Sequence, residues 1–372
     1  MPQRKAAGYF LFMFLLISAP LLAQEQTPPP KGKFSGLVFG DYFYNVARDT
    51  AIGRLSDVGT GGEKSMQGFQ LRRAYFTYDY DLSEMFTSCF RIDADQSALS
   101  SDGKIGIYLR DAFLRWKNVF HGSDLYIGMH PTPAFDVSET FWSYRALEKT
   151  IMDLRGIVSS RDLGVALRGK LDDEGTVSYW AMVGNNSSNK PETDKYKRYY
   201  LSVQLKPSGN FLATLYGDYK SQSNIDDPTS TTTPRATLSH GSFTSALFAG
   251  YTDPGQFILG LEGFLQSTAN DYHKSGATGL SSRNAIGISL FGWVNVQSDL
   301  SVVARYDYFD PNTDSNVKGD MRSYMVGGIS WRPDKNVSIM PNVQVETYQS
   351  LPSGQKFDAS VTGRVTFQYV IQ

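Results

Sequence analysis

The sequence predicts an all-β fold, a closed transmembrane antiparallel β-barrel of about 16 strands. Apolar and polar residues alternate from Phe34 onward, and no long stretch has the spacing of an amphipathic helix. Short connections alternate with long ones between these segments. Finally, the N-terminus has the form of an export signal, which places the chain outside the cytoplasm.

The export signal occupies residues 1–23 and is expected to be cleaved. It contains Arg4 and Lys5, an apolar run and small residues ending at Ala23, which are the three parts of a signal peptide. Gln24 stands where a bacterial lipoprotein carries its lipid-bearing cysteine, so no lipid anchor is predicted. The apolar run is also too short for a membrane-spanning helix.

The mature chain is then divided into two parts. Residues 24–33 contain three consecutive prolines and predict an extended tether. Residues 34–372 form the predicted barrel. One segment illustrates its alternation, with Tyr199 and Leu201 on one face and Ser202 on the other. Sixteen such segments begin near Phe34, Phe69, Met85, Ile105, Leu125, Leu163, Val177, Tyr196, Phe211, Ser242, Phe257, Ala285, Leu300, Ser323, Val337 and Ala359.

The connections have two kinds, as in barrels with short turns at one rim and long loops at the other. Long polar connections include residues 221–240 and 268–283. An even strand count returns both termini to the short-turn side. The seven short connections are predicted at residues 81–84, 121–124, 172–175, 206–210, 253–255, 297–299 and 332–336.

The alternating faces favour a barrel in a membrane over a soluble sandwich. Sixteen strands with one apolar face each, rich in Tyr and Phe toward the segment ends, fit a lipid-facing band bordered by aromatic girdles, and a chain with 41% hydrophobic and 13% aromatic residues is not disordered. The alternative is a secreted soluble β-protein, in which the apolar faces of the strands would form the core. The 36 basic and 37 acidic residues nearly balance, which argues against nucleic acid as a partner. Outer-membrane lipid is the expected surroundings.

Several segments, taken in order, resemble the Gram-negative phosphate-selective porins O and P. The likeness covers nearly the whole mature chain and rests on the succession of short strand signatures rather than on one motif. The matching segments are Gly128-Met129-His130-Pro131-Thr132-Pro133-Ala134-Phe135, Tyr144-Arg145-Ala146-Leu147, Arg161-Asp162-Leu163-Gly164-Val165, Phe69-Gln70-Leu71-Arg72-Arg73-Ala74, Arg305-Tyr306-Asp307 with Asp310-Pro311-Asn312, and Val326-Gly327-Gly328-Ile329-Ser330-Trp331 with Asn342-Val343-Gln344.

The resemblance implies a 16-stranded channel, usually a homotrimer, whose third long loop folds inward and narrows the pore. In this chain the third long connection runs from His130 to Ser160 and is also the longest. The resemblance further implies anions, phosphate among them, as the favoured solutes. The slightly acidic overall balance keeps a general or cation-tolerant porin open as the alternative.

Charged residues on the predicted lumen face form the first candidate site. Rows of both signs across a narrow pore would favour small polar or charged solutes over apolar ones. The competing interpretation is that these residues only pair across neighbouring strands. The channel-lining candidates are Arg91 and Asp93 with Asp95, Asp111, Arg115 and Lys117, and Arg168 and Lys170.

The long connection supplies the second candidate site, at the constriction. Arginine suits oxyanions because its guanidinium donates two hydrogen bonds at once. Helical spacing predicts a short helix over residues 143–153. The competing interpretation is a loop anchored to the wall by salt bridges. The basic candidates are Arg145, Lys149, Arg155 and Arg161, opposed by Glu139, Glu148 and Asp153.

No motif predicts an enzyme, a cofactor or a metal site. The four histidines lie far apart and form no catalytic or zinc-binding spacing. Residues 310–321 have the beginning of a calcium-loop spacing, but Ser315 replaces the glycine and Met321 the closing glutamate. Calcium binding there stays open. Cys89 is expected to be an inert thiol in the wall.

The predicted function is therefore passive diffusion of small hydrophilic solutes or inorganic anions through an outer-membrane porin, without a cofactor. A barrel enzyme and a structural or adhesive barrel are the alternatives from other classes. A catalytic pair on the outer face would favour the enzyme, and a plugged lumen would favour the structural protein.

Overall fold

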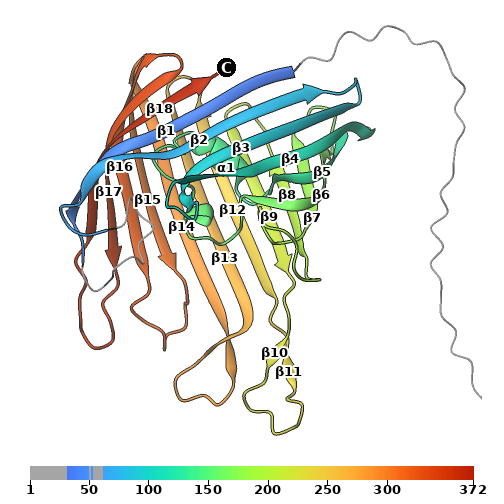
Figure 1. The fold of residues 1–372 in the computed structure, drawn as a ribbon, viewed down its shortest axis with the longest axis vertical. Helices are drawn as coiled ribbons and strands as arrows, with labels where there is room; N and C mark the ends of the chain where they lie inside the picture. Colours follow the sequence, from blue (N-terminus) through green and yellow to red (C-terminus); the bar gives the residue numbers. More distant parts are fainter. Residues whose placement is uncertain (1–31, 50–51, 53–61) are drawn as a thin grey trace, which may run out of the picture.

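The computed structural model describes residues 32–49, 52 and 62–372, and these form a closed barrel of 16 antiparallel strands (Figure 1). The predicted fold class is thus confirmed. The predicted signal peptide and most of the predicted tether lie outside the described residues. The wall strands are β1 (Gly32–Ala47), β2 (Gln67–Asp81), β3 (Phe86–Leu99), β4 (Ile105–Phe120), β5 (Ser123–Pro131), β6 (Arg161–Lys170), β7 (Val177–Gly184), β8 (Arg198–Leu205), β9 (Phe211–Lys220), β12 (Ser242–Asp253), β13 (Phe257–His273), β14 (Leu280–Gln297), β15 (Leu300–Asp310), β16 (Arg322–Asp334), β17 (Val337–Tyr348) and β18 (Ser360–Ile371).

Each wall strand pairs with its neighbours in sequence, and β1 closes the ring by pairing with both β2 and β18. Strands β10 (Ile225–Asp226) and β11 (Thr237–Leu238) form a separate small hairpin within the connection from β9 to β12. This hairpin extends far beyond the neighbouring strands at the lower end of Figure 1. Neither helix in the described residues is long and apolar enough to cross a membrane.

One predicted connection is mostly strand. β13 continues to His273 and β14 begins at Leu280, so residues 274–279 alone separate them, where the sequence predicted a connection over residues 268–283. The hairpin resumes pairing beyond an irregularity after Thr268, with Tyr272 opposite Ser281. The polar residues that suggested a loop belong to a part of the hairpin that extends past the apolar band.

The two faces of the wall alternate as predicted. On β13, Leu259 and Leu261 are about half exposed on the outer face, whereas Glu262 and Phe264 are buried on the inner face. The inner face is not polar throughout, however. On β12 to β14, Phe248, Phe264 and Phe291 point to the inner side and are buried.

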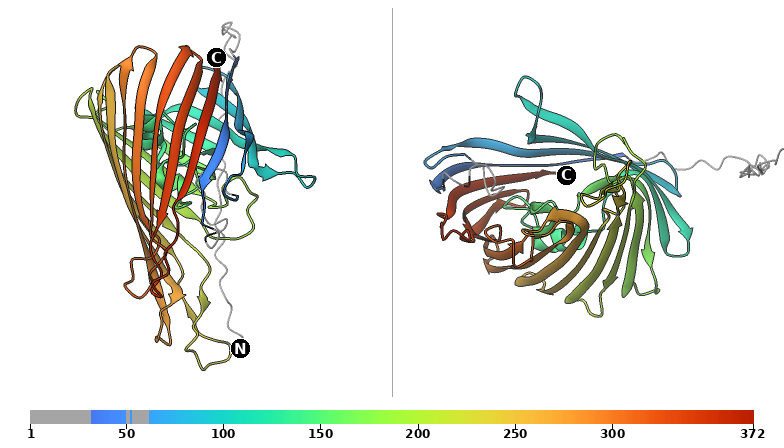
Figure 2. Two further views of the ribbon diagram at one scale, coloured as in Figure 1. Left: turned by 90° about the vertical axis from the view of Figure 1, so that its left-hand side faces the viewer. Right: turned by 90° about the horizontal axis from the view of Figure 1, so that it is seen from below.

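Residues 132–160 are the longest connection, as predicted, and the third connection at their rim; the second, residues 100–104, is a short hairpin rather than a long loop. They contain α1 (Asp136–Trp142) and α2 (Ile151–Leu154). The predicted helix over residues 143–153 is therefore wrong. Ser143 adopts a left-handed conformation with φ of 64° and ends α1. The charged residues that follow it at helical spacing are therefore not on one continuous helix. In both views of Figure 2 this green segment is drawn within the outline of the strands.

The two rims of the barrel carry different connections. Seven connections, among them residues 121–122, 298–299 and 335–336, have two to six residues and lie at the rim that holds the C-terminus (Figures 1 and 2). The backbone amide of Val370 donates to Asn336 O in one of these turns, which fixes the C-terminus there. Apart from two short hairpins, the connections at the opposite rim have more than ten residues.

We predict that the short-turn rim faces the periplasm. Cysteine replacing Gly209, whose added side chain would meet no atom within 4 Å, should resist an impermeant thiol reagent on intact cells, while Thr231→Cys in the hairpin of β10 and β11 should react. Both variants are made in a Cys89→Ser background, which removes the only native thiol. Labelling of the Gly209 position but not the Thr231 position would reverse the orientation.

Candidate functional site

Residues 132–160 are bound to the barrel by hydrogen bonds that involve backbone carbonyls of the segment. Gln344 Nε2 of β17 donates to Leu147 O at 3.1 Å, and Gln266 Nε2 of β13 donates to Ile157 O at 3.2 Å. Arg72 of β2 donates to the carbonyl of Ala146, and Arg305 of β15 donates to the carbonyl of Lys149. These strands belong to the half of the ring that runs from β13 through β18 and β1 to β2, so these bonds tie the segment to that half of the wall.

Apolar packing adds to these hydrogen bonds. Trp142 is fully buried, and its ring lies 5.3 Å from that of Phe291, while Phe141 lies 5.3 Å from Phe248. The segment thus covers the apolar side chains on the inner face of the wall. This explains why that face carries apolar residues instead of polar ones. Two clusters result, one around Trp142, Ala146, Leu147 and Leu154 and one around Phe135, Ile151, Met152 and Val158.

The predicted wall charges on β3 are engaged in ion pairs. Asp93 is fully buried, and Tyr108 donates to it at 2.7 Å while Arg110 lies at 3.0 Å and Arg73 also pairs with it. Arg91 Nη1 lies 2.9 Å from Asp111 Oδ2. The competing interpretation, pairing across neighbouring strands, therefore describes these residues.

Three of the four predicted basic residues of the constriction are also paired. Arg145 lies 3.1 Å from Glu139, and Arg155 lies 2.7 Å from Glu346 of β17. Arg161, the first residue of β6, pairs with Asp111 on β4. In the part of the chain that the structure describes, the Lys149 ammonium has no ion pair.

Burial opposes the charge of Arg145, but Asp153 and Glu139 outweigh it and raise the pKa of Arg145 above its ordinary value. Its guanidinium is therefore charged and neutralised locally. Such a pair contributes little net field to the rest of the pore, because the opposite charges lie within 4 Å of each other.

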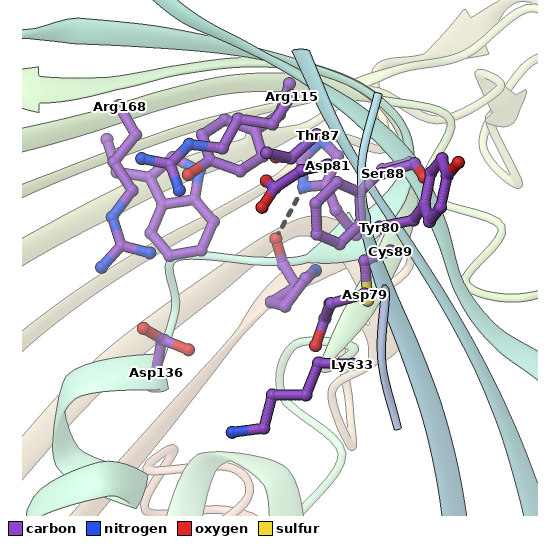
Figure 3. Close-up of a pocket in the computed structure, with 15 residues that line it drawn as sticks. Lys33, Asp79, Tyr80, Asp81, Thr87, Ser88, Cys89, Arg115, Asp136 and Arg168 are labelled. Carbon is purple, nitrogen blue, oxygen red and sulfur yellow. Dashed lines mark hydrogen bonds between the residues drawn. The ribbon is translucent and has the colours of Figure 1, made fainter. Parts of the chain in front are cut away.

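Three of the remaining candidates, Arg115, Arg168 and Lys170, border a polar cavity near the short-turn rim, while Asp95 pairs with Arg73. Arg115 lies 2.9 Å from Asp124, and Lys117 lies 3.6 Å from Asp81. Arg168 stacks on the indole of Trp180, with its guanidinium carbon 4.5 Å from the ring centroid. In Figure 3, Arg168 and the carboxylate of Asp136 lie on the same side of this cavity, and Arg115 and Asp81 lie farther along it.

The structure adds residues that sequence reasoning missed. Arg73 and Arg110 complete the buried network around Asp93, and Trp180 and Asp136 border the cavity. Strand alternation places Arg73 on a lumen face, so this residue was detectable. Asp136 borders the cavity because of how α1 lies in the barrel, and a local sequence pattern does not predict that position.

The described residues contain no group of three His, Cys, Asp or Glu side chains that could hold a metal ion. In residues 310–321, the carboxylate of Asp314 accepts hydrogen bonds from Tyr272 and from the amide of Asn316. Its oxygens are thus already engaged by donors. Cys89 is buried in β3.

We predict that Arg155 is a strong tether. Arg155→Ala leaves Glu346 buried without its cation and should lower the free energy of unfolding by about 3–5 kcal/mol. Lys117→Ala is the matched control, because its pair with Asp81 is longer and exposed and should contribute less than about 1 kcal/mol. Urea titration in lipid vesicles measures both. Equal losses for the two variants would contradict the tether.

Comparison with known proteins gives structural likeness only. No family model matches the chain, and no curated protein matches it in sequence. Among solved structures, it is similar to an anion-selective porin from Comamonas acidovorans, with 12% identity, a TM-score of 0.61 and coverage of 92% of this chain and all of that one.

Two further structures are of the same kind. The outer-membrane channel DcaP of Acinetobacter baumannii has 13% identity and a TM-score of 0.61, over 92% of this chain and 97% of that one. A trimer form of OmpT, an outer-membrane protein of Vibrio cholerae, has 12% identity and a TM-score of 0.59, over 92% of this chain and 100% of that one. The chain shares the fold of these proteins, while the resemblance to phosphate-selective porins stays a prediction.

Proposed function

We propose that this chain is an outer-membrane porin of a Gram-negative bacterium, through which small hydrophilic solutes diffuse passively. The observation that carries the proposal is the outer face of the closed wall, which combines an apolar middle with aromatic ends. Such a face suits a bilayer, and in hydrocarbon only helices and closed barrels satisfy every backbone group.

The pair of β9 and β12 illustrates this face. Tyr219 lies opposite Phe243 near the long-loop end, Leu215 opposite Leu247 in the middle, and Tyr251 opposite Phe211 near the short-turn end. All six side chains are exposed. Tyr219 stands eight positions after Phe211, about 26 Å along a strand, which fits the apolar band of a tilted transmembrane barrel.

The inside of the barrel supports a narrow polar passage. We propose that residues 132–160 fold into the lumen and set its narrowest section, because they are hydrogen-bonded to β2, β13, β15 and β17. Permeation through such a passage needs no cofactor and no covalent step. The absence of enzymatic activity is part of the proposal.

An anion preference, with phosphate among the candidate solutes, is the finer part of the proposal. Most lumen charges are neutralised in pairs, so selectivity depends on the cations without an ion pair in the described chain, which include Lys149, Arg168 and Lys170. A field from so few groups gives a weak preference. A general or cation-tolerant porin is the second candidate, favoured by the extent of pairing.

Assembly and location complete the proposal. We infer a homotrimer, since the similar Vibrio cholerae protein has a trimer form. Export by a cleaved signal peptide of residues 1–23, ahead of a tether, accounts for the location.

The test of selectivity is the reversal potential of reconstituted channels under a salt gradient. Wild-type channels should prefer chloride over potassium, and the double variant Lys149→Gln, Arg168→Gln should move the reversal potential toward cations by several millivolts because it removes two unpaired lumen cations. Phosphate should also block the chloride current of the variant less.

Lys335→Gln is the matched control, since this lysine lies exposed in a short turn outside the lumen. Its reversal potential should equal that of the wild type. Wild-type channels that already prefer cations would exclude the anion preference and leave the general porin. Protein that assembles but conducts no ions would exclude the porin itself.

A further inference from the structure

The polar cavity near the short-turn rim has the features of a binding site for a small solute. Two connected hollows of about 470 and 530 Å³ share Arg115, Tyr126, Asp136, Arg168 and Trp180. Volumes of this size hold a small organic molecule. We call this combined space the rim pocket (Figure 3).

The charges of the rim pocket are balanced. An inorganic anion such as phosphate would meet carboxylates as well as cations, so this lining holds an anion less tightly than a solute with charges of both signs. A solute that carries one charge of each sign meets a complementary group at each end. The basic residues are Lys33, Arg115, Arg168 and Lys170, and the acidic residues are Asp79, Asp81, Asp124 and Asp136.

Of the charged groups that line the larger hollow, three are available to a solute. In the described chain, the guanidinium of Arg168, the ammonium of Lys170 and the carboxylate of Asp136 have no hydrogen-bond or ion-pair partner. Arg115 and Asp124, by contrast, satisfy each other at 2.9 Å. The pocket thus offers two cations from β6 and one carboxylate from the start of α1.

The cations are also positioned in advance. Arg168 and Lys170 are separated by one residue on β6 and hence lie on the same face of the wall. The stacking of Arg168 on Trp180 restricts its guanidinium, whose planar set of donors matches a carboxylate. Holding the donors in place before binding lowers the entropic cost of capturing a ligand.

Apolar surface completes the rim pocket. Tyr126, Pro133, Val137 and Trp180 line it beside the charges. Trp180 is nine-tenths buried, and its Nε1 has no acceptor within the described residues. An apolar group of a solute would lie against these side chains.

We propose that the rim pocket binds small zwitterionic solutes, namely amino acids with an apolar side chain. The carboxylate of the solute binds Arg168 and Lys170, its ammonium binds Asp136, and its side chain contacts Tyr126 and Trp180. The inference rests on the proposed porin function, because it names the class of solute that this passage would retain. It goes beyond that function because it assigns the solute a binding site with defined residues, whereas the porin proposal invokes only the electrostatic field of the lumen charges.

The test is calorimetric titration of the folded full chain in detergent, which measures binding without requiring conduction. L-phenylalanine should bind about tenfold more tightly than 3-phenylpropionate, which lacks the ammonium, and than 2-phenylethylamine, which lacks the carboxylate, since each loses one charged hydrogen-bonding group. Inorganic phosphate should bind more weakly than L-phenylalanine.

Two variants assign the ends of the solute. Asp136→Asn should weaken L-phenylalanine binding about tenfold and leave 3-phenylpropionate binding unchanged. Arg168→Gln should weaken binding of both carboxylates and leave 2-phenylethylamine unchanged. Asp334→Asn and Lys335→Gln, at the exposed short turn between β16 and β17, remove the same charges away from the pocket and should change none of these affinities.

The outcomes separate this inference from the porin proposal. Equal affinity of the wild type for L-phenylalanine and 3-phenylpropionate, or tighter binding of phosphate, would overturn the zwitterion site. No heat of binding for L-phenylalanine in channels that conduct would also overturn it, while leaving the porin intact. Binding by protein that does not conduct would support the site and exclude the porin.

Discussion

Closure of the ring between β1 and β18 is the constraint on which the rest of the structure depends. The pairing runs from Gly36 opposite Ile371 to Ala47 opposite Val361, with one irregularity after Asn45, and it gives both terminal strands a second partner. Gly40 shows how tightly this seam is built, because a Cβ there would lie 2.2 Å from Gln70 O, where the pairing of β1 with β2 shifts register. The ring in turn fixes which side chains face outward and which face the lumen.

The strand pattern was predictable because it is local. Alternation with a period of two and turn-forming residues indicated β4 at Ile105, β7 at Val177 and β15 at Leu300, where the structure begins them. Tertiary contacts decided the rest. The pairing of Tyr272 with Ser281 extends β13 and β14, and the left-handed Ser143 divides residues 132–160 into two helices.

The candidate site was predictable in composition but not in pairing. Alternation placed Arg91 and Asp93 on the lumen face, yet it could not reveal that Arg73 and Arg110 surround Asp93. Cross-strand register determines such partners, and register depends on the whole sheet. The apolar inner face of β12 to β14 could not be predicted for the same reason. Phe248 and Phe291 are covered by Phe141 and Trp142, which lie more than 90 residues earlier in the chain.

That distance in sequence has a kinetic meaning. Trp142 packs in a cluster with Phe248, Phe291, Val303, Val326 and Met340, which belong to strands made long after it during synthesis. Contacts between residues so far apart form late, because the intervening chain must first be ordered. Residues 132–160 therefore cannot pack against their partner strands until the C-terminal half of the wall has formed. Until then their apolar side chains are exposed and prone to aggregation.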